Sequence, residues 1–254
     1  MSHDVLYEVA EKVAWVTINR PDARNALNAS VRSGLKQAFE RFNNDESAAV
    51  LVLTGAGDKA FCAGGDLKEM ADTKLQIPPA DYVPQPNRTI EVDKPVIAAV
   101  NGIAYGGGFL LAQSADLIVA AESAKFGVTE AHLGRGAPWA APLPWLIPPR
   151  IAMEMLVTAE PVTAQRAYEV GLVNHVVPLA DLHERTAAFA ARIVANAPLS
   201  VRASKAMVYA VAEYPRSQAF DEAERIWESA YLSEDAQEGP RAFRDKRSPV
   251  WQGR

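Results

Sequence analysis

The sequence predicts an α/β protein, because three features of its 254 residues point to that class. Short apolar runs typical of strands alternate with segments of helical periodicity over most of the chain. The run AVLVLTG at 49–55 is continuously apolar and ends at glycine, which is typical of a strand buried on both faces. From Leu199 onward the periodicity is almost entirely helical. The expected organisation is therefore a core over residues 1–196 and a helical region over residues 197–254.

The beginning of the chain predicts a hairpin followed by a helix. β-branched and aromatic residues fill 6–9 and 13–18, on either side of the charged pair at 11–12, which predicts two antiparallel strands. Asn28 is a suitable N-cap, and apolar residues recur at helical spacing after it. We therefore expect an amphipathic helix over residues 29–43.

The rest of the core is predicted to mix strands, helices and loops. Residues 95–100 and 117–121 predict two more buried strands. The proline-rich residues 72–87 predict an irregular loop, and so does the segment 131–150, which is rich in proline and tryptophan. Periodicity predicts two helices, a strand and a third helix at 151–158, 164–170, 172–177 and 179–196.

The glycines Gly106, Gly107 and Gly108 lie where a predicted strand passes into a predicted helix. The first N–H groups of a helix lack internal partners and carry the positive end of its dipole. Residues without Cβ also let a ligand approach the backbone closely. The triplet therefore indicates either a tight turn packed on a neighbouring strand or a site for an anion or oxyanion. Gly64 and Gly65 repeat this arrangement before a short helical segment within 61–70.

Composition and charge disfavour several classes of protein. Lys and Arg number 26 against 31 Asp and Glu, and no block is strongly basic, so we expect no sequence-independent binding of nucleic acid. The longest apolar run is much shorter than the about 20 residues of a membrane helix, and the N-terminus shows no leader pattern, so we expect a cytoplasmic protein. A single cysteine, Cys62, excludes an internal disulfide. The four histidines lack metal-ligand spacing, so no metal site is expected.

Five segments, taken together and in order, resemble the crotonase superfamily, which includes the enoyl-CoA hydratases and isomerases. They are NRP and NAL within 19–27, FCAGGDLKEM at 61–70, KPVIAAVNGIAYGGG at 94–108, AKFGVTEAHLG at 124–134 and AMEMLVT at 152–158. The resemblance implies a spiral of ββα turns with a CoA-thioester site over residues 1–196. It also implies that residues 197–254 assemble homotrimers or hexamers.

The resemblance implies three catalytic residues as well. The thioester oxygen is expected to accept hydrogen bonds from the backbone N–H groups of Gly65 and Gly107, both of which the glycine pattern already marks as donors. Glu130, within FGVTEAHLG, matches the second of two glutamates that family hydratases carry, and is expected to transfer the proton.

Substrate binding is expected near the start of the short helix within 61–70. The family places cationic side chains there, close to the CoA phosphates, so we expect Lys68 to contact CoA, with Ala63 and Asp66 beside it. Coenzyme A is part of the thioester substrate in this family, and no prosthetic group is expected.

Two departures from the family pattern leave the reaction open. Leu110 stands where family hydratases carry their first glutamate, and two carboxylates normally share the work of placing a water and delivering a proton. One carboxylate is enough for a 1,3-proton shift, although it can also activate a water and pass the proton on. The predicted function is an enoyl-CoA hydratase or dehydratase, with a 3,2-enoyl-CoA isomerase or a catalytically silent fold as alternatives. RGAPWAAP at 135–142 replaces a P-G-x-G-G segment, which should reshape the acyl pocket.

Overall fold

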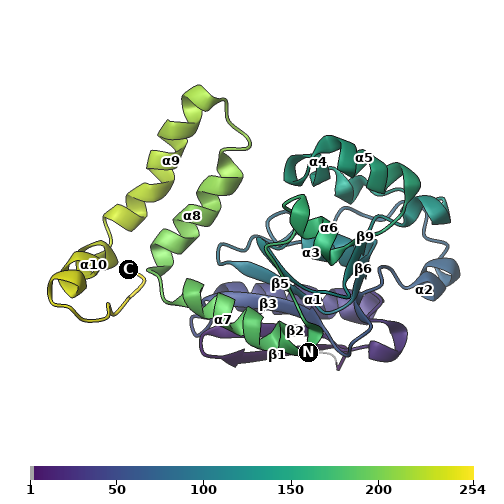
Figure 1. Ribbon diagram of the computed structural model, residues 1–254, viewed down its shortest axis with the longest axis horizontal. Coiled ribbons are helices and arrows are strands. Elements are labelled where there is room, and N and C mark those ends of the chain that lie inside the picture. Colours follow the sequence, from purple (N-terminus) through teal and green to yellow (C-terminus); the bar gives the residue numbers. More distant parts are fainter. Residues whose placement is uncertain (1–2) are drawn as a thin grey trace.

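The described residues form two β-sheets that share one core (Figure 1). The computed structural model describes residues 3–254, so the first two residues of the predicted core lie outside the described part. The larger sheet has the order β1-β2-β3-β5-β7-β10, with strands Val5–Ala10, Val13–Ile18, Val50–Gly55, Val96–Val100, Leu117–Ala121 and His175–Val177. The smaller sheet has the order β4-β6-β8-β9, with strands Ala60–Cys62, Ile103–Tyr105, Lys125–Gly127 and Val162–Thr163.

After the hairpin of β1 and β2, successive turns of the chain add one strand to each sheet. One turn consists of β3, β4 and α2 (Leu67–Asp72), and the next consists of β5, β6 and α3 (Gly107–Gln113). β3, β5 and β7 pair in parallel in the larger sheet, as β4, β6 and β8 do in the smaller one. These stacked turns confirm the predicted spiral of ββα units.

The first turn confirms the predicted hairpin and helix. β1 and β2 pair antiparallel around Glu11 and Lys12, whose φ angles of 50° and 62° suit a tight hairpin turn. The helix α1 spans Ala29–Asn44 and begins at Asn28, whose side chain accepts a hydrogen bond of 2.9 Å from Val31 N. Its apolar face is fully buried and comprises Val31, Leu35, Ala38, Phe39 and Phe42.

Buried side chains pack on both faces of the larger sheet. On β3, Val50 and Val52 belong to one apolar cluster, whereas Leu51 and Leu53 belong to the other. This alternation confirms that the continuously apolar run at 49–55 is buried on both sides. The helix α7 (Leu182–Val194) covers one of these faces, and α1 covers the other.

Three C-terminal helices stand apart from the sheets (Figure 1). They are α8 (Pro198–Ala210), α9 (Arg216–Tyr231) and α10 (Glu234–Arg244), in agreement with the helical periodicity of this part. An ion pair of 2.9 Å joins Lys205 of α8 to Asp116, which also accepts a hydrogen bond from the hydroxyl of Tyr209. Within residues 3–254, no helix combines the length and apolar character that a membrane crossing requires.

The structure corrects the prediction of a strand that leads directly into the glycine triplet. β5 ends at Val100, and the short strand β6 follows it in the other sheet before α3 begins. The segment 131–150 is also wrongly predicted as a loop, because it forms short helices at Glu130–Leu133, Pro138–Ala140 and Leu143–Leu146 before α5 begins. The predicted helices at 151–158 and 164–170 correspond to α5 (Pro149–Thr158) and α6 (Ala164–Glu169).

Candidate active site

Three neighbouring strands of the smaller sheet bring the predicted catalytic residues together. Gly65, Gly107 and Glu130 follow two or three residues after the last residues of β4, β6 and β8. Because these strands are parallel neighbours, their carboxyl ends meet at one edge of the sheet. All three residues line one cavity of about 870 Å³.

The backbone amide of Gly65 points away from Leu27, the residue with which it forms a β-bridge. Leu27 N donates to Gly64 O over 2.8 Å, and Asp66 N donates to Leu27 O over 3.3 Å. In such a parallel bridge, the residue between the two bonded groups points its own N–H the other way. No hydrogen bond from Gly65 N is found within residues 3–254, so this N–H is available as a donor at the cavity wall.

The amide of Gly107 is the second predicted donor. Gly107 is the first residue of α3, so its N–H has no acceptor inside the helix. A Cβ on Gly107 would lie 3.8 Å from Gly64 Cα and 2.8 Å from Leu27 Cδ1, which shows how closely the two glycine loops approach. The preceding residue, Gly106, has a φ of 53° that favours glycine, and its N–H donates to Gly127 O.

The two carboxylate oxygens of Glu130 differ in their hydrogen bonding. Oε1 accepts a hydrogen bond of 2.9 Å from the indole N–H of Trp139, whereas Oε2 is buried and has no partner in the described part of the chain. A Cβ on Gly106 would lie only 3.3 Å from Oε1, so the carboxylate packs directly on the glycine backbone. Burial raises the pKa of Glu130, and hydrogen bonds, including that of Trp139, oppose the effect only in part.

Trp139 is itself held from two sides. The side-chain amide of Gln113 donates to Trp139 O over 3.0 Å, and the indole meets the ring of Phe109 edge to face at a centroid distance of 6.0 Å. The sequence predicts that this segment reshapes the pocket, but it does not predict that Trp139 donates a hydrogen bond to Glu130, the predicted catalytic residue. An indole N–H donates and cannot accept, so Trp139 orients Glu130 without exchanging protons with it.

Among the carboxylates in the described lining of the cavity, only Glu130 has an oxygen that is shielded from water and no cation as a partner. Leu110 lies on α3 in the cavity wall and is 4% exposed, so an apolar side chain occupies the position of the first family glutamate. Among the other acids of the wall, Asp22 is exposed and Asp66 is paired with Arg20. Glu130 therefore stays the predicted proton-transfer group of this cavity.

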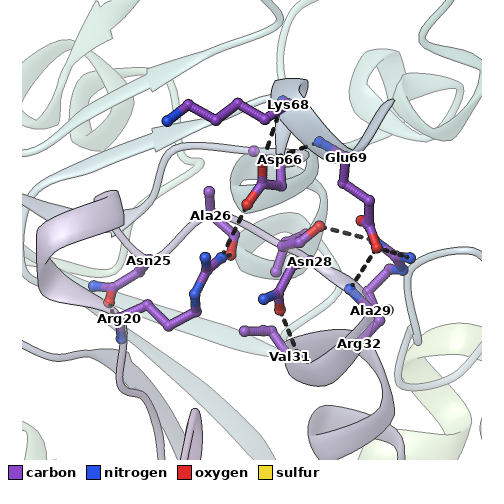
Figure 2. A network of polar contacts seen from close by, with 12 residues as sticks. Arg20, Asn25, Ala26, Asn28, Ala29, Val31, Arg32, Asp66, Lys68 and Glu69 are labelled. Atoms are coloured by element: carbon purple, nitrogen blue, oxygen red, sulfur yellow. Dashed lines mark hydrogen bonds and ion pairs between the residues drawn. The ribbon is translucent and has the colours of Figure 1, made fainter. Parts of the chain in front are cut away.

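The predicted CoA-binding residues Ala63, Asp66 and Lys68 also line the cavity, but they differ in their contacts. The carboxylate of Asp66 accepts from the backbone N–H groups of Lys68 and Glu69 and so caps α2. It also pairs with Arg20 at 3.2 Å, as Figure 2 shows. The side chain of Lys68 extends away from this network in Figure 2, which leaves its ammonium group available for a ligand.

A second ion pair fastens α2 to the start of α1 (Figure 2). Glu69 pairs with Arg32 at 2.7 Å and accepts a hydrogen bond of 3.0 Å from Ala29 N. The guanidinium of Arg32 also stacks on the ring of Tyr82, a residue of the cavity wall, at 4.0 Å from the centroid. These contacts fix the helix that follows Gly65 and therefore help to position the first predicted amide donor.

Two other kinds of candidate group are a nucleophilic cysteine and a set of metal ligands. Cys62 is fully buried, and burial raises its pKa to about 12, which keeps the thiol protonated and unreactive. Across residues 3–254, no three side chains of His, Cys, Asp or Glu are grouped so that they could hold a metal ion.

Known proteins share this architecture over their whole length. The family model for enoyl-CoA hydratase/isomerase matches residues 8–254. A crystal structure of enoyl-CoA hydratase from Mycobacterium tuberculosis H37Rv has a TM-score of 0.91 and 37% identity, with 100% of both chains covered. An enoyl-CoA hydratase/isomerase from Mycobacterium paratuberculosis has a TM-score of 0.92 and 36% identity, with 99% of both chains covered. Carnitinyl-CoA dehydratase from Salmonella typhi is 41% identical over 249 residues, which cover 94% of each chain.

These structures place the fold in the crotonase class, which the sequence motifs resemble. Within that class, the chain belongs to the enoyl-CoA hydratase/isomerase family. The names of its relatives fit the hydratase/dehydratase type of this family. Enzymes of that type are lyases. Enzymes of the family act on CoA thioesters.

Proposed function

We propose that the protein adds water to a 2-enoyl-CoA thioester and, in reverse, dehydrates a 3-hydroxyacyl-CoA. The observation that carries this proposal is the state of Glu130. One oxygen is fixed by Trp139 and the other has no partner within residues 3–254, in a cavity that both glycine donors also line. The hydratases and the dehydratase among the relatives support the same reaction type.

The two backbone donors serve the charge that develops during this reaction. Removing or adding a proton at the carbon beside the thioester carbonyl places negative charge on the carbonyl oxygen, as an enolate. In the proposed complex, this oxygen accepts from the N–H groups of Gly65 and Gly107. Because both donors are part of a rigid backbone, they need no reorganisation as the charge forms.

A single carboxylate can perform both proton transfers. In dehydration, Glu130 takes the proton from Cα and then gives it to the departing hydroxyl of Cβ, so that C–H and C–O bonds break, the C=C bond forms and water leaves. In hydration, it takes a proton from the water whose oxygen bonds to Cβ, and it passes a proton to Cα. A carboxyl group with a raised pKa suits this exchange, because both of its protonation states are needed in each cycle.

The remaining assignments follow from the cavity wall and the outer helices. Lys68 would bind a phosphate of CoA and Ala63 would contact its chain, whereas Asp66 would act indirectly by holding Arg20 and capping α2.

The reaction needs no prosthetic group. Residues 197–254 would form a homotrimer or hexamer, which the strongly exposed aromatic residues Phe220, Tyr231 and Phe243 support. The single cysteine supports a cytoplasmic location.

The second candidate is 3,2-enoyl-CoA isomerisation, and the apolar Leu110 favours it because a 1,3-proton shift needs no water-binding acid. Incubation with 2-enoyl-CoA and 3-enoyl-CoA thioesters, followed by product masses, separates the two. We expect the 2-enoyl thioester to gain the mass of one water. Conversion of the 3-enoyl thioester without a change of mass, and no reaction of the 2-enoyl thioester, would instead establish an isomerase. Binding of both thioesters without turnover of either would contradict both enzymatic assignments.

Replacing Trp139 with phenylalanine is expected to move the acidic limb of the pH profile of kcat/KM toward higher pH. The base works only when deprotonated, so activity falls as pH drops through the pKa of Glu130. The indole hydrogen bond lowers that pKa, and its loss raises it further. We also expect kcat to fall about tenfold, the value of a lost hydrogen bond of about 1.4 kcal/mol. Trp145→Phe is the control, because Trp145 is exposed and outside the cavity wall; an unmoved limb in Trp139→Phe would contradict the role of Trp139.

A further inference from the structure

Arg135 is a cavity arginine without an acidic partner. Arg20 also lines the cavity, but its guanidinium is paired with Asp66. Arg135 forms no ion pair within residues 3–254, and the single hydrogen bond of its side chain runs from Nη1 to Leu75 O over 2.7 Å. Its Nη2 is shielded from water and has no partner in the part of the chain that the structure describes. A guanidinium has five N–H donors and cannot lose its charge, so most of the binding capacity of Arg135 is unused.

Arg135 is placed close to the reacting groups by the backbone. Arg135 N donates to Glu130 O over 2.9 Å, so the arginine stands one short turn after the proposed catalytic acid. It is the first residue of RGAPWAAP, the segment that also supplies Trp139. The bond to Leu75 O reaches across to the proline-rich loop 72–87, so the guanidinium bridges two walls of the cavity.

Its surroundings add another cation and a polar amide, and the acids that act on the same wall, Asp66 and Glu69, are each paired with an arginine. Arg88 lines the cavity and donates to the side chain of Gln85, which is 5% exposed. Burial raises the pKa of Tyr82 in the same wall. The charges of Arg32 and Arg135 act to lower this pKa, whereas those of Glu69 and Asp66, each of which is paired with an arginine, act to raise it. An acyl group that extends into this part of the cavity therefore meets positive potential.

We propose that Arg135 forms a subsite for a carboxylate at the far end of the acyl group. The preferred substrates are then CoA monothioesters of dicarboxylic acids, in the 2-enoyl or 3-hydroxy form. This inference rests on the proposed function, because it names the acyl group that is hydrated or dehydrated at the same site. Carboxylates match the planar donor edge of a guanidinium, and such charge-assisted bonds are stronger than neutral ones.

The same surroundings disfavour a cationic acyl group. A carnitinyl group carries a quaternary ammonium, which proteins usually bind with aromatic faces and acidic side chains. Here it would approach Arg135 and Arg88, neither of which forms an ion pair within residues 3–254, while Glu130 is committed to proton transfer. The 41% identity with carnitinyl-CoA dehydratase therefore does not extend to the preferred acyl group.

Binding of saturated thioesters tests the subsite without any turnover. Calorimetry would compare glutaryl-CoA with pentanoyl-CoA and adipoyl-CoA with hexanoyl-CoA, pairs of equal carbon number that differ only in the terminal carboxylate. 4-Trimethylammoniobutanoyl-CoA is the cationic probe. For the diacid whose length fits, we expect binding roughly 10- to 100-fold tighter than for its uncharged match, the range of a hydrogen bond to a charged group. The cationic thioester should bind more weakly than pentanoyl-CoA.

The variant Arg135→Gln should reduce this preference to within about threefold, because glutamine keeps a donor but removes the charge. Arg150→Gln is the matched control: Arg150 is exposed at the start of α5 and outside the cavity wall, so the preference should persist. If Arg135→Gln does not fold, Arg135→Lys retains the charge and should keep part of the preference. Equal binding of diacid and monoacid by the wild type would overturn the inference, as would uniform weakening of all ligands in Arg135→Gln.

Kinetics then separate this inference from the proposed function. The kcat/KM for 2-pentenedioyl-CoA should exceed that for 2-pentenoyl-CoA by a similar factor, and Arg135→Gln should remove the difference mainly through KM. Hydration of both thioesters at equal kcat/KM would overturn the subsite and leave the hydratase assignment intact. A diacid preference in binding without hydration of either thioester would support the subsite and overturn the hydratase assignment.

Discussion

Replacing Glu130 with glutamine is expected to lower kcat by roughly 100- to 10,000-fold, the usual contribution of a general acid–base group. Glutamine has nearly the same shape as glutamate, and its amide oxygen can still accept the hydrogen bond from Trp139. It cannot take a proton from Cα or from water, so the chemical step fails while substrate binding persists. KM should therefore change little. Steady-state rates with a 2-enoyl-CoA thioester measure both constants.

Glu154→Gln provides the matched control for this variant. Glu154 lies on α5, is exposed and is absent from the cavity wall, so its replacement removes one carboxylate without touching the site. Both variants should show thermal unfolding within a few degrees of the parent. A folded Glu130→Gln variant that keeps half of the parental kcat would refute the assignment of Glu130 as the proton-transfer group.

The larger sheet is predictable from sequence because its strands carry long local signals. β3, β5 and β7 are continuous apolar runs, and β1 and β2 flank a tight charged turn. The strands of the smaller sheet have two or three residues each, too few for any periodicity. They form because they pair with strands from neighbouring turns of the spiral, and such long-range pairing leaves no mark in a single short segment.

The site likewise has parts that local sequence patterns predict and parts that depend on long-range contacts. Gly65 and Gly107 stand at helix starts, which is a local pattern, and Glu130 lies in a motif that resembles the family. Nothing local predicts that Trp139 donates to Glu130, because the two residues meet only through the turns of a segment that departs from the family pattern. The ion pair of Asp66 with Arg20 joins residues 46 positions apart, so neither residue alone indicates it.

The second large effect on turnover is expected from Gly107→Pro, which removes the backbone N–H of Gly107. Proline is tolerated at the first position of a helix, where the N–H has no internal acceptor, so α3 should still form. The substitution deletes one of the two proposed donors to the thioester oxygen. Turnover should then fall roughly 100- to 1000-fold, the usual cost of removing one oxyanion-hole donor. The loss should appear in kcat, because the enolate charge develops only as the reaction proceeds.

Gly107→Ala distinguishes the lost donor from the added bulk. Alanine keeps the N–H, and its Cβ would lie 2.8 Å from Leu27 Cδ1, the end of a flexible side chain that can move aside. Its rate should therefore fall only several-fold. The difference between the proline and alanine variants, measured on folded protein with the same 2-enoyl-CoA, gives the contribution of the N–H group. If the two variants turn over at similar rates, the thioester oxygen does not depend on Gly107, and the two-donor arrangement is wrong.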